Sequence, residues 1–409
     1  MIALAMGAAA LLCFAAPPQP QRQAQPRVTD IEQADAAFRA GETEKAEVFA
    51  RRAAGRNPGD AHAQMILGVI AAQREEWPAA NRHFQIVVRL APDDPNGHFY
   101  LGQAKLYQKQ WDAAARNFER ALALGFPDRD RLLVELAFAD NEAGRPQRAL
   151  ERLTGVPRPD DAPRAAQYFA VTGFAHSKLG RPREAIEAIG KARDADATNP
   201  QYWEFLIAAL IGTDQTPAAL REAIQAQAKF PDHAGVQYLF ALANYYVVES
   251  PLLPLALRNL REAEPATPPS PRVLLVEGML FRKQGKTDEA IRAFEQAAQR
   301  GAPDSHLLLG IVYKENGNYD AAEREYRAAE KENASNGQVM LELGKLSLTR
   351  GQFEEARTRL VKAVTLLPDF GSAHYQLGLT YGRLGNKEKS EHHLNRSREI
   401  DRRQAEAQK

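Results

Sequence analysis

The sequence predicts an all-α fold in which helix hairpins stack one after another, an α-solenoid, and three observations lead to that prediction. A Leu-Gly pair recurs every 34 residues, beginning at Leu309, Leu343 and Leu377. Because one such unit cannot bury its apolar side alone, repetition at this period indicates units that stack on their neighbours. The other two observations are a glycine and then a small residue at constant distances after each pair: Gly317, Gly351 and Gly385, then Ala322, Ala356 and Ser390.

Each unit is predicted to be a hairpin of two helices. Apolar residues at helical spacing run for about a dozen residues, a short polar stretch follows, and a second helical pattern begins. The glycine beside the leucine lets the two helices approach closely, and Ala80 and Ala114 of the second helix are expected to face it. Pro58 and Pro92 end second helices. The two clearest early units contain Leu67-Gly68, Trp77, Ala80 and Phe84, then Leu101-Gly102, Trp111, Ala114 and Phe118.

The positions of these residues resemble the tetratricopeptide repeat, whose 34-residue signature has Trp, Leu-Gly, Tyr, Ala, Phe, Ala and Pro at the same places. The resemblance implies a right-handed superhelix of about eleven repeats that cover nearly the whole chain. Residues 28–264 are expected to form seven repeats, and residues 273–409 four more with a polar C-terminal helix. The proline-rich segment 265–272 is expected to be a joint between them, because prolines end helices.

The N-terminus carries a different pattern. Residues 1–16 are apolar and uncharged but short for a membrane span, so they are predicted to be a signal peptide or an N-terminal anchor. Residues 17–27, rich in Pro and Gln, are predicted to be a linker. We therefore expect a bacterial protein exported to the periplasm or the exterior, or a cytoplasmic one if the apolar segment is not a signal. The only cysteine, Cys13, lies in this segment, so a processed chain has no disulfide or thiol chemistry.

The remaining composition argues against several classes of function. Lys and Arg number 53 and Asp and Glu 52, so no excess charge points to nucleic acid or to an anionic membrane. The linear signatures of zinc proteases, phosphate-binding loops and serine hydrolases are absent, and the repeats leave no room for a catalytic domain. We predict that the chain is not an enzyme and has no cofactor and no metal site.

The histidines fit packing better than metal binding. His98, His306 and His374 share one repeat position, which Trp203 fills in another unit. Because they lie one or more repeats apart, they cannot meet at a single ion. His392 and His393 are adjacent on a predicted helix, so they point to different faces.

The first helices of the hairpins supply the candidate binding surface. In the tetratricopeptide family these helices line a concave groove that binds extended peptides or partner helices, and the resemblance implies a mostly apolar groove here. The Lys and Asn set with which some members hold a C-terminal carboxylate is not seen. Alternatively, superhelical curvature buries the groove residues between successive first helices. The candidate partner-binding residues are Phe99, Tyr107, Phe138, Phe174, Tyr238, Leu242, Tyr245, Tyr246, Met279 and Arg282.

These observations predict a scaffold that binds extended or helical segments of partner proteins, in the assembly of a cell-envelope or secretion complex. The alternative is an accessory subunit that presents substrates to a separate enzyme such as a glycosyltransferase or a peptidase. In both cases the partners are other proteins, with no nucleic acid and no membrane beyond the N-terminal anchor.

Overall fold

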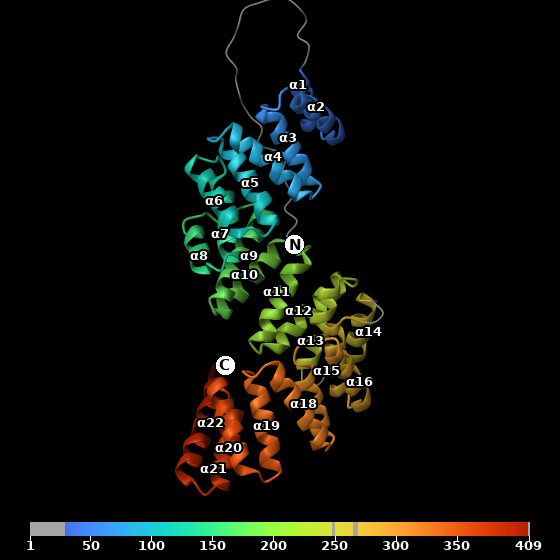
Figure 1. Cartoon of the computed structure of the whole chain (residues 1–409), viewed down its shortest axis with the longest axis vertical. Helices are drawn as coiled ribbons and strands as arrows, with labels where there is room; N and C mark the ends of the chain where they lie inside the picture. The colour runs from blue at the N-terminus through green and yellow to red at the C-terminus, as the bar shows by residue number, and fades with distance from the viewer. Residues whose placement is uncertain (1–28, 248–249, 265–268, 408–409) are drawn as a thin grey trace, which may run out of the picture. The chain divides into compact units, whose positions relative to one another are not determined.

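The computed structural model describes residues 29–247, 250–264 and 269–407, and within these ranges the regular secondary structure consists of 22 α-helices, ten pairs of which pack as hairpins (Figure 1). The prediction of an all-α stack of hairpins is confirmed. The predicted signal segment 1–16 and linker 17–27 lie outside the described residues, as do residues 265–268 of the predicted joint.

The chain divides into two compact units, and the division falls between Thr213 and Asp214. The first unit contains α1 (Asp30–Arg39), α2 (Thr43–Arg56), α3 (Ala61–Gln73), α4 (Trp77–Leu90), α5 (Pro95–Tyr107), α6 (Trp111–Ala123), α7 (Arg129–Glu142), α8 (Pro146–Leu153), α9 (Ala162–Lys178), α10 (Pro182–Ala195) and α11 (Pro200–Gly212). The second contains α12 (Thr216–Lys229), α13 (Ala234–Tyr246), α14 (Leu253–Ala263), α15 (Pro271–Lys283), α16 (Thr287–Gln299), α17 (Ser305–Glu315), α18 (Tyr319–Glu332), α19 (Gly337–Thr349), α20 (Phe353–Leu366), α21 (Gly371–Arg383) and α22 (Lys387–Ala407).

The first helices of several hairpins begin at a side-chain cap. The Asp60 carboxylate accepts hydrogen bonds from the backbone N–H groups of His62 and Ala63 at the start of α3. Asp94 and Asn199 cap α5 and α11 in the same way. Such caps satisfy N–H groups that have no partner within the helix, so they stabilise the point at which these repeats begin.

The turn inside a hairpin contains one residue in the left-handed conformation. Gly351 and Gly385 adopt φ of 75° and 78° there, whereas Glu75 and Lys109 hold the same position with φ of 61° and 59°. For a residue with a Cβ this conformation costs about 1 kcal/mol. The turns at Glu75 and Lys109 therefore carry strain that a glycine avoids.

The glycine of each Leu-Gly pair lies against a large side chain of the second helix. A Cβ on Gly68 would lie 2.5 Å from the Phe84 ring, and one on Gly344 would lie 2.6 Å from Leu360. The prediction that glycine permits close approach is confirmed, but the nearest neighbour of Gly68 is this ring rather than Ala80. The ring fills the space that a glycine without a Cβ leaves open.

The repeat position shared by His98, Trp203 and His374 joins successive hairpins. The Trp203 Nε1–H donates to the Ala197 carbonyl at 3.1 Å, and the Nε2 atoms of His98 and His374 lie 2.9 and 3.1 Å from the carbonyl oxygens of Pro92 and Pro368. In each case the partner lies six residues earlier, just after the preceding helix. The packing role predicted for His98 and His374 is confirmed.

Residues 269–272, the described part of the predicted joint, lie in the second unit. The helices that flank it contact each other: the Arg261 Nε of α14 lies 2.5 Å from the Glu277 carboxylate of α15, and the Arg282 Nη1 donates to the Tyr245 hydroxyl at 2.9 Å. Hydrogen bonds therefore connect the hairpins on both sides of this segment.

None of the helices in the described ranges has the length and apolarity that crossing a membrane requires. In the same residues, His, Cys, Asp and Glu side chains form no group of three or more that could hold a metal ion.

Candidate protein-binding site

Phe99 belongs to the core, which corrects the sequence prediction. Its side chain has 0% exposure, and its ring centroid lies 4.3 Å from that of Phe126 and 5.8 Å from that of Phe118. The ring fills the space between α5 and α6, so it is not available to a partner. Met279 is also nearly buried, at 8% exposure, where it packs against Phe294 and Leu309.

The other predicted aromatic residues of the first unit remain partly exposed. The Tyr107 ring stacks on Trp77 at 3.8 Å, and the Phe138 ring meets Trp111 edge-on at 6.5 Å. Such contacts fix the orientation of rings that still present one face or edge to solvent. Rigid aromatic side chains of this kind lose little conformational freedom when they bind.

Phe205 joins this surface, although sequence reasoning did not select it. It is 43% exposed on α11, and its ring lies edge-on to Phe174 of α9 at 4.4 Å. Its neighbours Leu206 and Ile207 are buried, with 4% and 0% exposure, and they supply the packing of this turn. The repeat positions that the family resemblance selected do not include Phe205. The sequence did contain an indication of this: Phe205 is a large apolar residue outside the buried face of the helix, which Leu206 and Ile207 form.

We call Tyr107, Phe138, Phe174 and Phe205 the aromatic row, and they lie on α5, α7, α9 and α11. Each of these helices is the first helix of its repeat, so the row contains one aromatic side chain from each of four successive repeats.

In the second unit, the predicted residues of α13 lie around an exposed tyrosine. Tyr246 is 47% exposed and meets the Tyr245 ring edge-on at 5.1 Å. Leu242 packs partly buried beside Met279, and the Arg272 guanidinium lies 3.5 Å from the centre of the Tyr238 ring. Tyr238 is thus engaged by a cation of the same unit, whereas Tyr246 keeps an exposed face.

A cavity of about 470 Å³ opens at the C-terminal ends of α13, α15 and α17, and we call it the tyrosine cavity. The Arg282 Nε and Nη2 donate to the Glu315 carboxylate at 2.8 and 2.7 Å, which raises the pKa of Arg282. The Lys283 ammonium donates to the carbonyls of Asn244, Tyr245 and Val247, while burial lowers its pKa. The cavity is lined by Tyr245, Tyr246, Val247, Arg282, Lys283 and Glu315.

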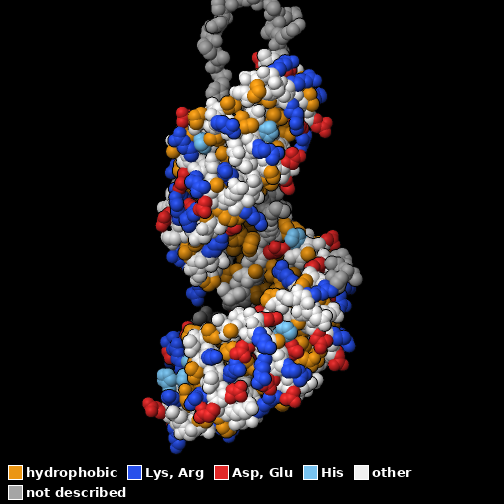
Figure 2. All heavy atoms as spheres, viewed as in Figure 1, with side chains coloured by type: hydrophobic (Ala, Val, Ile, Leu, Met, Phe, Trp, Pro, Cys, Tyr) orange, Lys and Arg blue, Asp and Glu red, His pale blue; other side chains and the backbone are white. Residues whose placement is uncertain are grey.

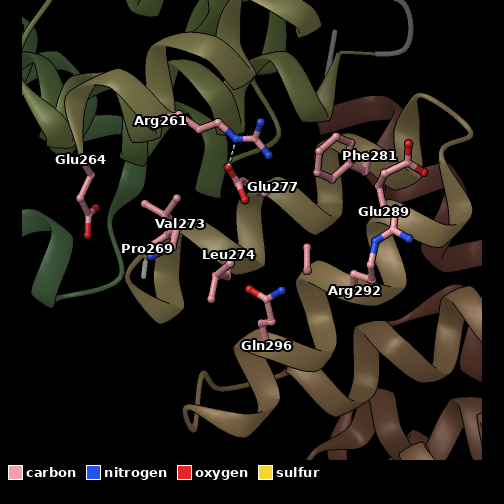
Figure 3. A pocket seen from close by; sticks show the side chains of 11 residues that line it. Arg261, Glu264, Pro269, Val273, Leu274, Glu277, Phe281, Glu289, Arg292 and Gln296 are labelled. Atoms are coloured by element: carbon pink, nitrogen blue, oxygen red, sulfur yellow. Dashed lines mark hydrogen bonds and ion pairs between the residues drawn. The ribbon is translucent and has the colours of Figure 1, made fainter. Parts of the chain in front are cut away.

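A second cavity, of about 460 Å³, lies beside α14, α15 and α16 (Figure 3). The Glu277 carboxylate in its wall is 4% exposed and is paired with Arg261, whose guanidinium lies 5.6 Å from the centre of the Phe281 ring. The sequence prediction did not include this cavity, because its lining residues come from second helices as well as first helices. The ion pair already neutralises its most buried charge.

Two buried carboxyl groups on first helices have opposite ionisation behaviour. Burial raises the pKa of Glu135 on α7, which is 1% exposed and has Gln103 as a hydrogen-bond donor at 3.3 Å. Burial also opposes ionisation of Glu342 on α19, but hydrogen bonds from Lys314 and Lys345 outweigh it and lower its pKa. The two groups thus differ in the direction of their pKa shift: the lysine partners decide it for Glu342, and burial decides it for Glu135.

Outside these sites the charges are mixed. Figure 2 shows acidic and basic side chains interspersed over the visible face of each unit, with hydrophobic side chains between them. Many of them pair across neighbouring helices, as Arg350 does with Asp320 at 2.6 Å.

Comparisons with known proteins place this arrangement in a family. Residues 31–95, 275–337 and 307–369 match one model described as tetratricopeptide repeat, and residues 371–404 match another. No curated protein matches the sequence. A tetratricopeptide repeat protein from Parabacteroides merdae has a similar structure over 62% of this chain and 98% of its own, with 18% identity and a TM-score of 0.55. A chain of the APC/C hetero-tetramer Cut9-Hcn1 gives 90% and 86% coverage, 12% identity and a TM-score of 0.48.

The stacked hairpins and the matched segments define a helical repeat protein. The chain belongs to the tetratricopeptide repeat proteins, as its sequence pattern predicted. Proteins of this class generally act as scaffolds for protein–protein interactions, and their fold is typically non-catalytic.

Proposed function

We propose that this protein is a scaffold that binds apolar segments of partner proteins on the aromatic row of its first unit. The observation that carries the proposal is the placement of partly exposed aromatic side chains on four successive first helices. Aromatic residues are enriched at protein interfaces and account for much of their binding energy. A row of such side chains offers consecutive contacts to an extended or helical segment.

We further propose that the scaffold acts outside the cytoplasm, in the assembly of a cell-envelope or secretion complex. The support is the uncharged apolar sequence of residues 1–16, followed by a Pro- and Gln-rich stretch. Cell fractionation together with the intact mass of the purified protein tests this proposal. A cytoplasmic protein that retains its first residues would contradict it.

Photo-crosslinking tests the aromatic row directly. A photoreactive phenylalanine analogue at position 205 should form adducts with partner proteins in the cells that produce the chain. The matched control places the same analogue at Leu90 of α4, which is 42% exposed on a second helix. The adducts at position 205 should disappear in the Phe138→Ala/Phe174→Ala background. Identical adducts at positions 205 and 90, or adducts that persist in that background, would overturn the proposal.

A further inference from the structure

The first helices of the second unit carry two clusters in which cations outnumber acids. At the tyrosine cavity, Arg282 and Lys283 lie with a single carboxylate, Glu315. The second cluster consists of Lys314 and Lys345, which share the buried carboxylate of Glu342. Each such cluster retains one net positive charge.

Arg282 retains hydrogen-bonding capacity after its contacts are counted. Two of its five N–H groups donate to Glu315 and a third donates to the Tyr245 hydroxyl. Two N–H groups are therefore not used by these contacts. Lys283 differs, because its three N–H groups meet three backbone carbonyls, so it supplies charge to the cavity rather than a donor.

We propose that the second unit binds acidic segments, with an Asp or Glu side chain of the partner in the tyrosine cavity and a second acidic side chain beside Lys314 and Lys345. This inference rests on the proposed function, since it names the chemistry of a partner that the scaffold holds. A carboxylate balances the excess charge of each cluster and accepts hydrogen bonds from a guanidinium in its preferred geometry.

The surroundings favour a side chain over a chain terminus as the source of the carboxylate. Exposed apolar residues lie on both flanks of the clusters, with Tyr246 on α13 and Tyr375 and Leu379 on α21. Tyr375 and Leu379 are 47% and 38% exposed. An extended segment that contacts both flanks passes over the clusters, so its acidic groups are internal residues.

The corresponding positions of the first unit lack this charge. Where Lys314 and Lys345 approach Glu342, the equivalent positions around Glu135 are Leu106 and Phe138. The preference for acidic segments is therefore a property of the second unit.

Selection from a library of random peptides displayed on phage tests the inference, because peptides fused at their C-terminus present side-chain carboxylates but no free chain terminus. The full chain should enrich peptides that contain Asp and Glu. The best of these, made as a synthetic peptide, should bind about tenfold more weakly to an Arg282→Gln/Lys345→Gln variant. Its affinity should also fall as salt is added. Replacing its acidic residues by Gln or Asn should cause a similar loss.

A control must show that weaker binding does not result from misfolding. The Lys345→Gln variant leaves Glu342 paired with Lys314, and circular dichroism should show the same helix content as in the parent chain. Selected peptides without acidic enrichment, or acidic peptides that bind both proteins equally, would overturn the inference. The proposed function would then still stand if the Phe138→Ala/Phe174→Ala variant lost the selected peptides, and would fail if no peptide depended on the aromatic row.

Discussion

Glu135 and Glu342 occupy the same position of the repeat, directly before Leu136-Ala137 in the first unit and Leu343-Gly344 in the second. Both are buried, with 1% and 3% exposure. Glu342 meets two lysines, whereas Glu135 accepts hydrogen bonds from the amides of Gln103 and Gln167 and has Arg131 as the nearby cation. The repeat therefore fixes where a side chain lies, while its neighbours decide whether its pKa is raised or lowered.

Of the changes that test this comparison, replacing both Lys314 and Lys345 should have the largest effect on stability. The Lys314→Met/Lys345→Met variant leaves the Glu342 carboxylate buried without a cation, which should lower the free energy of unfolding by about 3 kcal/mol. Urea denaturation measures the change. Adding Glu342→Gln should recover most of the loss, and Lys362→Met, at an exposed position of α20, serves as the control. Full stability of the double variant would show that the pairing is not needed.

Glu135→Gln should have the opposite sign and stabilise the first unit by about 1 kcal/mol at neutral pH, since an amide can be buried without the cost of ionisation. The raised pKa of Glu135 means that the native state binds its proton more tightly than the unfolded state. The contribution of Glu135 to stability is therefore greatest below the ordinary pKa of a glutamate, and it is lost as pH rises through the pKa that Glu135 has in the folded chain. Denaturation of wild type and variant over a pH series should show a slope in the wild type that the variant lacks.

The hairpin turn offers a second contrast, between one repeat of each unit. Lys109 has a left-handed φ of 59° where Gly351 has 75°. Lys109→Gly should therefore stabilise the chain by up to about 1 kcal/mol, less the entropy that glycine adds to the unfolded state. The reverse change, Gly351→Lys, should destabilise it by a similar amount. Thermal melts of both variants provide the measurement, and equal melting temperatures would contradict a cost at this turn.

The last hairpin offers a third contrast, whose effect is confined to acidic pH. His306 pairs with the Glu325 carboxylate at 2.7 Å, whereas at the same two repeat positions His374 meets His393, with 3.0 Å between their Nδ1 atoms. Burial and the neighbouring His374 lower the pKa of His393 to about 4. Because the folded chain holds His393 in its neutral form, this histidine contributes stability above the ordinary pKa of histidine, and that contribution is lost as pH falls toward 4. After correction for the intrinsic exchange rate, the protection of amides in α22 should fall as pH is lowered over that range. The His393→Phe variant should show a smaller pH dependence, and what remains comes from His374, whose pKa burial also lowers.

The sequence predicted the hairpins, the repeat phase and the packing role of the shared histidine position, because all three follow from residues within one repeat. It did not predict the burial of Phe99, which depends on Phe126 in the connection to the next hairpin. It also missed Phe205, whose pairing with Phe174 joins two repeats. Contacts between repeats depend on side chains that a 34-residue pattern does not specify, and the raised pKa of Glu135 depends on such contacts too.

The junction between hairpins illustrates how far such a fold can diverge in sequence. Histidine, tryptophan and, at Gln237, an amide all supply an N–H to the carbonyl six residues earlier. Residues 96–274 lie outside the segments that match the family models, yet they contain two of these junctions, at Trp203 and Gln237. Because the junction requires a donor rather than a particular residue, substitutions there erode the recognisable signature while leaving the stacking intact.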